Sequence, residues 1–351
     1  MNERLSVIIR IMRFPLVILV VLIHELSVEV HHLHLSLDGW NLFHCFSELV
    51  SHNIARMAVP MFFIISGFLF FIRYQDRPMQ LPDFKNQWIK RIRTLLIPYL
   101  TWNALYVVAI LVKRLIFTKF GFENDDKYSL LSEGLGYIFW TGPIDYPLWY
   151  VRDLIVMTLL APAYYYVIKK NRILFLAYLG ILYLTPVKFS FLPVTALLFF
   201  GIGAFLSVDK VDCLALCRRM KKISYLASLV FLGITLCFNG YSFHFWLLRL
   251  ACPFWCIAFF NIMDSICDKE NTKEKLISLE KPVFFIYAIH VIYIIDWIRS
   301  LCLSLFGAGV SGAWLSYLLI APMVISICIL LYRLLEKTVP QVLSVLCGNR
   351  T

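Results

Sequence analysis

The stretch FPLVILVVLIHELSVEVHHLH, residues 14–34, decides the fold of this chain. Its first ten residues carry no charge, which is typical of a helix inside a lipid bilayer. The ionisable pair His24 and Glu25 then follows, before the apolar run has reached the roughly 20 residues that a span requires. The sequence therefore predicts a membrane helix that carries ionisable side chains at membrane depth.

The composition of the whole chain indicates a polytopic membrane protein. Of its 351 residues, 60% are hydrophobic and 16% are charged, whereas a soluble domain has about 25% charged residues. The mean hydropathy is +0.76. Because no A-x-A-like cleavage site follows the first apolar run, we expect it to be a permanent span. We expect the net charge of +11 to reflect basic cytoplasmic loops, and we predict no nucleic acid partner.

Hydropathy predicts ten membrane helices, and the two near residues 173–207 are the shortest. The predicted spans are 11–30, 54–73, 94–113, 148–168, 173–187, 190–207, 222–240, 244–264, 281–303 and 313–335. Lys and Arg gather near the N-terminus and in segments 73–93, 169–172, 208–222 and 265–281. Cytoplasmic loops collect these residues, so both termini are predicted to be cytoplasmic. The predicted fold is thus an all-α membrane bundle, with one membrane domain over 1–351 and no appended soluble domain.

Several predicted spans carry polar side chains at a similar depth. His24 follows Arg13 by eleven residues, or roughly 16 Å along a helix. The other groups are Arg152, Asp153, Arg249, Tyr287, His290 and Asp296. A charge at membrane depth costs at least about 2.5 kcal/mol on insertion scales, so each should face the bundle interior. Structural ion pairs, or a neutral histidine bonded to a neighbouring helix, could explain each group singly. The whole set favours a polar cavity in the central or outer part of the bundle.

A basic cluster begins the third predicted span. Lys90 and Arg93 are neighbours on one helix face, and Arg91 lies beside them. The simple interpretation is membrane topology, and the functional one is a clamp for phosphate groups.

No metal site or disulfide framework is predicted. His31, His32 and His34 are expected to lie in a solvated interfacial segment, and no HExxH motif is present. The ten cysteines form no CxxC pair, and several have the helical spacing of small buried residues.

The chain resembles the acyltransferase-3 family of integral membrane acyltransferases, and in particular its compact O-acetyltransferase branch. The resemblance rests on RFPLVILVVLIH (13–24), RMAVPMFFIISGFLFF (56–71), KRIRTLLIPYLTWN (90–103), PLWYVRDLIVMTLLAP (147–162) and FFIYAIH (284–290). It implies transfer of an acyl group, usually acetyl, from acetyl-CoA or another cytoplasmic acyl-CoA. The implied acceptor is a hydroxyl of a cell-surface glycan or its lipid-linked precursor, at the bacterial inner membrane. No permanently bound cofactor is expected.

The family's histidine falls on His24, and its basic R-x-x-R motif falls on Lys90–Arg93, where the first position is Lys. Arg152 and His290 also fall on family-like positions. We predict that His24 is the general base, since an imidazole has an unperturbed pKa near 6.5. Lys90, Arg91 and Arg93 would bind the phosphates of the donor.

The remaining candidates have less defined roles. Arg152 or Arg249 could stabilise an oxyanion or bind an acidic glycan. Asp153 and Tyr287 are further substrate-binding candidates, and Glu25 is included among the catalytic ones. Glu25 is not expected to orient His24, because adjacent helical residues project about 100° apart.

Three alternatives stay open. Ser66 in FIISGF could be an acylated nucleophile, although small residues in a span commonly serve helix packing. The polar cavity would also suit a transporter or flippase of a lipid-linked glycan. A scaffold subunit of an envelope-assembly complex would tolerate loss of His24.

Overall fold

The computed structural model describes residues 2–25, 33, 36–123, 126–186 and 193–349, and these residues contain helices and no strands. The first half holds α1 (Glu3–Ile23), α2 (Gly39–Ser47), α3 (Ala58–Phe71), α4 (Leu81–Arg91), α5 (Ile97–Phe120), α6 (Trp149–Leu159) and α7 (Ala161–Leu184). The second half holds α8 (Val194–Val208), α9 (Cys213–Arg219), α10 (Lys221–Cys237), α11 (His244–Ile266), α12 (Glu270–Ser278), α13 (Val283–Ile289), α14 (Ile295–Phe306), α15 (Val310–Thr338) and α16 (Pro340–Leu346). The predicted all-α fold is confirmed.

Short 3-10 and π-helical turns join several of these helices. The 3-10 turns are η2 (Ile54–Met57), η3 (Ile72–Tyr74), η5 (Asp126–Glu133) and η7 (Tyr146–Leu148). The π-helical turns are η1 (Glu48–Asn53), η4 (Ile92–Leu96), η6 (Tyr137–Thr141) and η8 (His290–Ile294).

The helices long and apolar enough to cross a membrane number six in the described part of the chain, or up to eight when two bent pairs are counted. One bent pair joins α6 to α7 at 58°, and the other joins α8 to α9 at 117°. The predicted number of ten spans is therefore not confirmed. The predicted spans 148–168 and 173–187 fall in the first bent pair, and α10 has only 17 residues.

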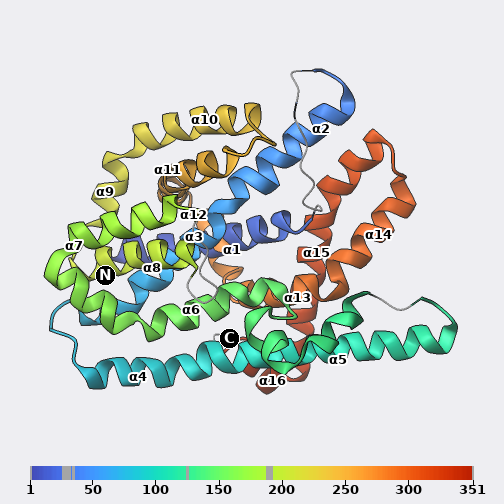
Figure 1. Cartoon of the computed structure of the whole chain (residues 1–351), viewed down its shortest axis with the longest axis horizontal. Helices are drawn as coiled ribbons and strands as arrows, with labels where there is room; N and C mark the ends of the chain where they lie inside the picture. The colour runs from blue at the N-terminus through green and yellow to red at the C-terminus, as the bar shows by residue number, and fades with distance from the viewer. Residues whose placement is uncertain (1, 26–32, 34–35, 124–125, 187–192, 350–351) are drawn as a thin grey trace.

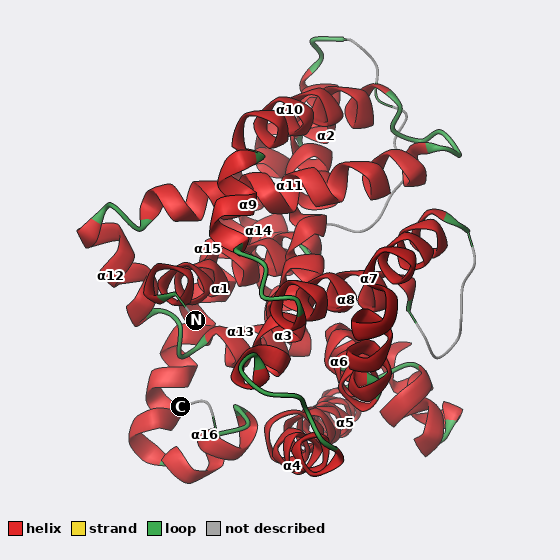
Figure 2. Ribbon diagram, turned by 90° about the vertical axis from the view of Figure 1, so that its left-hand side faces the viewer, coloured by secondary structure: helices red, strands yellow, loops and turns green. Residues whose placement is uncertain are grey.

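Helix α1 lies at the centre of the bundle. It contacts α3, α11, α13 and α15, and Figure 1 shows it between the α10–α11 layer and the long α4–α5 rod. Figure 2 views that rod nearly end-on, with α1, α3 and α13 inside the ring of helices. Its buried apolar side chains between Ile8 and Val21 lie on several faces of the helix, although Arg10 within this range is exposed. The uncharged second half of α1, from Phe14 to Ile23, suits such an interior position.

The closest helix pair is α3 with α8, because glycines let the two backbones touch. A Cβ atom at Gly203 would lie 2.1 Å from the carbonyl oxygen of Ile64, and one at Gly67 would lie 2.3 Å from that of Phe200. Neither position has room for a side chain. The glycine of the FIISGF motif thus serves helix packing, as small residues commonly do in membrane bundles.

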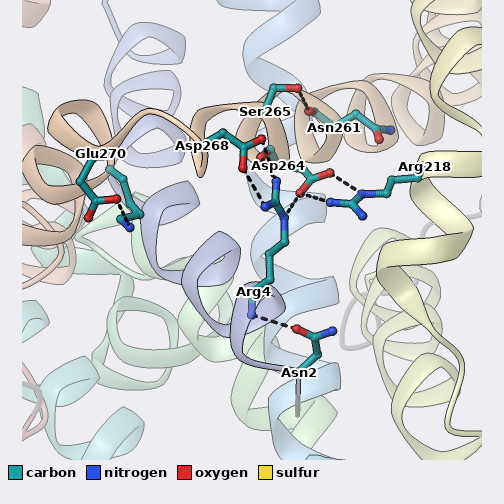
Figure 3. A network of polar contacts seen from close by, with 9 residues as sticks. Asn2, Arg4, Arg218, Asn261, Asp264, Ser265, Asp268 and Glu270 are labelled. Carbon is teal, nitrogen blue, oxygen red and sulfur yellow. Dashed lines mark hydrogen bonds and ion pairs between the residues drawn. The ribbon is translucent and has the colours of Figure 1, made fainter.

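Ion pairs join the segments that the sequence predicted to be cytoplasmic. Asp264 accepts from Arg4 at 2.6 Å and from Arg218 at 2.7 Å, and Arg4 also binds Asp268 (Figure 3). Further pairs join these segments: Arg10 and Arg13 with Glu280, Arg172 with Asp209, and Lys210 with Asp76. Arg4 lowers the pKa of the exposed Asp268 carboxyl by donating a hydrogen bond to it. These contacts place the five basic segments on one side of the bundle, which agrees with the predicted topology.

Candidate active site

Two cavities lie along helix α1, one beside its middle and one at its C-terminal end. The first, which we call the basic cavity, has a volume of about 550 Å³ and lies beside the arginines of α1. The second, which we call the histidine cavity, has a volume of about 640 Å³ and lies at the C-terminal end of α1. The polar residues of the basic cavity are Arg10, Arg13, Ser66, Arg91, Tyr150, Glu280, Lys281 and Tyr287. Those of the histidine cavity are His24, Tyr106, Lys127, Tyr137, Tyr146, Asp296 and Arg299.

His24 is held at the end of α1 by side chains from other segments. Arg299 donates to the backbone carbonyl of His24 at 2.8 Å and to that of Glu25 at 2.9 Å. The imidazole Nδ1 is hydrogen-bonded to the Tyr146 hydroxyl. The imidazole ring also stacks on His290, with ring centroids 5.3 Å apart and planes at 29°. The side-chain partners of His24 therefore come from elsewhere in the bundle, and Glu25 is not among them.

His290 presents an unused ring nitrogen in the protein interior. It is fully buried, and its Nδ1 lies 2.9 Å from the carbonyl oxygen of Tyr287 and 3.1 Å from that of Ile286. Carbonyls only accept hydrogen bonds, so Nδ1 carries the proton and Nε2 of the neutral ring is an acceptor. Within the described chain, Nε2 has no hydrogen-bond partner. A basic nitrogen is thus available beside His24.

The backbone departs from a regular helix directly after His290. The π-helical turn η8 separates α13 from α14, and Tyr293 within it has a φ of 62°. The left-handed region costs a bulky residue about 1–3 kcal/mol and persists where the surroundings enforce it. Such turns occur frequently at functional sites. Here the break ends one helix at His290 and lets the next place Asp296 and Arg299 on the histidine cavity.

Three charged side chains lie together at the histidine cavity: Asp296, Lys127 and Arg299. The sequence indicated Asp296 but neither Lys127 nor Arg299. Asp296 pairs with Lys127 and lies 3.3 Å from Arg299. Lys127 comes from η5, in the long segment after α5, and its ammonium lies 5.9 Å from the centre of the Tyr106 ring. Sequence spacing gave no signal for Lys127, because only the fold brings that segment against α14.

Glu25 is fully buried but does not line the histidine cavity. Its carboxyl oxygens have no side-chain hydrogen-bond partner in the described ranges. The structure thus separates Glu25 from its sequence neighbour His24, whose ring faces the cavity. We therefore assign Glu25 no direct contact with a substrate in that cavity.

Arg152 and Asp153 connect α6 to the preceding π-helical turn. The Arg152 guanidinium donates to Asp153 at 2.8 Å and to the carbonyls of Trp140 and Thr141 at 3.0 and 2.9 Å. Neither side chain lines the two cavities. These bonds fix the end of η6, whose first residue, Tyr137, lines the histidine cavity. Arg152 and Asp153 are therefore positioned to support the wall of that cavity.

Arg249 lies apart from both cavities. Its guanidinium donates to the carbonyls of Tyr183 and Thr185 at the end of α7, and it covers the ring of Phe245 at 3.9 Å. The sequence predicted a membrane depth for Arg249 similar to that of His24, but the Arg249 side chain caps the C-terminal end of α7. These contacts account for the half-buried Arg249 without any bound substrate.

The basic cavity separates the three residues of the predicted phosphate clamp. Arg91 lines the cavity, and its half-buried side chain has an Nε without a hydrogen-bond partner among described residues. Lys90 and Arg93 are exposed and do not line it. Arg10 and Arg13 complete the cationic wall with Lys281, and the sequence had assigned both arginines to topology only. Arg91 is one position from Lys90 and two from Arg93, and helical residues at those spacings point in different directions, which explains the separation.

A thin wall, which we call the septum, separates the two cavities. On the basic side lie Tyr150 and Tyr287, whose rings meet edge to face with centroids 6.0 Å apart. Tyr287 donates its hydroxyl to the carbonyl of Pro147, next to Tyr146 on the histidine side. Val291, which lines the histidine cavity, follows Tyr287 by four residues, which is about 6 Å along a helix. Ser66 lies on the basic side, with its hydroxyl 3.2 Å from that of Tyr150.

The sequence predicted no metal site at His31, His32 and His34. His31, His32 and His34 lie outside the described residues, and the described ones contain no group of three or more potential ligands.

A membrane bundle with one arginine-lined cavity and one histidine-lined cavity fits a class of enzyme that acts on two substrates. The chain belongs to the acyltransferase family whose model is described as "Acyltransferase domain" and matches residues 7–333. The protein is thus a multi-pass membrane acyltransferase, and the transporter and scaffold alternatives are not favoured.

One relative is similar over most of its length. The Succinoglycan biosynthesis protein ExoH of Rhizobium meliloti (strain 1021) is 27% identical over 317 residues, covering 86% of this chain and 81% of that protein. No solved structure matches the chain.

Proposed function

We propose that this enzyme transfers an acyl group, most simply acetyl, from a cytoplasmic acyl-CoA to a hydroxyl of a cell-surface glycan or its lipid-linked precursor. The observation that carries this proposal is the septum between the two cavities. It separates a cationic cavity from a histidine cavity by about one helical turn, from Tyr287 on the basic side to Val291 on the histidine side. The relative's printed name, which refers to succinoglycan biosynthesis, supports a polysaccharide acceptor.

The basic cavity is proposed to bind the donor. Arg10, Arg13, Arg91 and Lys281 offer charge-assisted hydrogen bonds to the phosphates of a nucleotide thioester. The segments that line this cavity share a side with the other basic segments, which the charge distribution predicts to be cytoplasmic. The thioester end would then point toward Tyr150 and Tyr287 at the septum.

The histidine cavity is proposed to bind the acceptor. With Nδ1 donating its proton to Tyr146, His24 would present Nε2 as the base for the acceptor hydroxyl. The hydroxyl oxygen attacks the thioester carbonyl, the carbon–sulfur bond breaks, and the thiolate takes up one proton. His290 lies against His24 with an unpaired Nε2 and can accept a proton from it. Tyr150, whose hydroxyl faces the basic side, is the nearest candidate donor to the oxyanion.

The cavity size and lining agree with a sugar acceptor. A volume of about 640 Å³ lies within the range of small-molecule sites. Tyrosines, Lys127, Asp296 and Arg299 supply both hydrogen-bond donors and acceptors. We expect the acceptor to enter from the side of the membrane opposite to Arg10 and Arg13, which suits a plasma membrane location.

The test measures donor binding and acyl transfer separately. Purified protein in lipid nanodiscs is titrated with labelled acetyl-CoA, and base-labile acetyl esters are measured on glycans from cells that express each variant. His24→Gln should retain donor binding and lose ester formation, because only the base is removed. Ester formation by His24→Gln near the wild-type level would overturn the base assignment. Absence of binding by wild type to acetyl-CoA and to longer acyl-CoAs would overturn the donor.

A further inference from the structure

A third cavity, which we call the lateral cavity, plays no part in the proposed reaction. It has a volume of about 170 Å³ and lies between α1, α3, α8, α9 and α11. Leu5, Ile9 and Met12 form its α1 side, so it lies on a different face of α1 from Arg10 and Arg13. Every side chain that lines it is a Leu, Ile, Met, Phe or Cys.

Such a cavity suits a hydrocarbon chain rather than water. A buried water needs two to four polar partners, and cavities lined by apolar side chains stay dry and bind apolar molecules. The lateral cavity also reaches the protein surface, because Leu216 on its wall is 38% exposed and Met220 is half-buried. A chain from the surrounding membrane can therefore enter it.

The opening of the lateral cavity lies beside a basic segment. Helix α9 turns away from α8 by 117° and leads from the cavity wall into Arg218, Arg219, Lys221 and Lys222. Arg218 is engaged by Asp264 at 2.7 Å. Arg219 and Lys222 are exposed and make no hydrogen bond or ion pair with the side chains that the structure describes. Two cations are thus available where a lipid headgroup would lie.

We propose that the lateral cavity and this basic segment together bind one anionic phospholipid of the cytoplasmic leaflet. Part of one acyl chain would fill the space between α1, α9 and α11, since a cavity of about 170 Å³ is close in size to one that holds benzene, and the phosphate would contact Arg219 and Lys222. Basic residues next to the membrane attract anionic headgroups, and the apolar cavity distinguishes this site from a general basic surface. A free phosphate would use only the cations, whereas a phospholipid uses both parts. This inference is independent of the proposed acyl transfer.

The test measures lipid that remains bound to purified protein. The protein is purified in mild detergent from membranes containing phosphatidylglycerol and phosphatidylethanolamine, and bound lipid is quantified by native mass spectrometry. Wild type should retain about one phosphatidylglycerol per chain. The double variant Arg219→Gln/Lys222→Gln should bind it about 30-fold more weakly, since both cations that would face the headgroup are removed at about 1 kcal/mol each. Ile257→Trp, which fills the cavity, should lose it as well.

The control variant removes the same number of positive charges from another basic segment on the same side of the bundle. Lys269→Gln/Lys275→Gln removes two exposed cations on and beside α12 and should keep the lipid. The Arg219/Lys222 variant alters exposed side chains only, so it tests the proposal even if Ile257→Trp does not fold. Equal retention by the two double variants, or no retained phosphatidylglycerol in wild type, would overturn the proposal. Inorganic phosphate at millimolar concentration should not displace the lipid, and displacement would indicate a simple anion site.

Discussion

Replacing Arg91 by Gln should weaken acyl-CoA binding far more than the same replacement at its neighbour Lys90. Arg91 lines the basic cavity, is half-buried, and has an enclosed Nε without a partner in the described structure. A hydrogen bond to a charged group contributes about 1.5–3 kcal/mol. Since about 1.4 kcal/mol corresponds to a tenfold change, Arg91→Gln should raise the Kd about 10- to 150-fold.

Lys90 provides a matched control with the same loss of charge. It is exposed and lies outside the cavity, so its interaction with the donor is screened by water and salt. Exposed ion pairs contribute at most about 1 kcal/mol, which limits the change in Kd to about fivefold. The assay is equilibrium binding of labelled acetyl-CoA to protein in nanodiscs at about 0.15 M salt. A Kd for Lys90→Gln as high as that of Arg91→Gln would refute the reasoning.

Three further predictions test the packing, the site and the ion pairs. Gly203→Ala should lower the free energy of unfolding by about 1–3 kcal/mol, because the new Cβ would meet a backbone carbonyl. Gly180→Ala places its Cβ in open space and should not lower it. Thermal unfolding in detergent distinguishes the two variants. Tyr146→Phe removes the hydrogen bond to His24 and should lower the rate of ester formation about two- to tenfold, with donor binding unchanged. An unaltered rate would contradict the role of Tyr146 in orienting His24. The pKa of Asp268 is lowered by Arg4, so its stabilising effect is complete above the ordinary aspartate range near 3.8 and is lost in stronger acid. Asp268→Asn should therefore lower the melting temperature equally at pH 6 and pH 8, and a difference that grows between those pH values would contradict the assignment.

Periodicity and hydropathy predicted the helical membrane fold. The predicted number of spans was not confirmed, because two of the apolar segments are bent. The chain turns by 58° after Leu159 and again at Asn171, whose φ of −157° is not helical. A hydropathy window measures apolar length and does not register a change of direction. Tertiary packing decides whether such a segment continues as one span or turns back.

The candidate site was predicted in part. The sequence indicates how deep a residue lies in the membrane, but it does not indicate the direction in which the side chain points. His24 and His290 were expected at one layer, and their rings do stack. Arg249 has a similar predicted depth, yet it points to the end of α7. Tyr146 and Lys127 come from segments between helices, where neither spacing nor hydropathy indicates which helix they will contact.

The thin septum also has an electrical consequence. Where water fills both cavities, most of the membrane voltage falls across the few ångströms from Tyr287 to Val291 rather than across the whole bilayer. One elementary charge that crosses 100 mV gains or loses about 2.3 kcal/mol. In the proposed reaction, the proton released by an acceptor hydroxyl and taken up by a cytoplasmic thiolate crosses that field inward, in the direction that a negative cell interior favours. The rate of acyl transfer in sealed vesicles should then rise with membrane potential, so that the enzyme couples surface modification to the energised state of the cell.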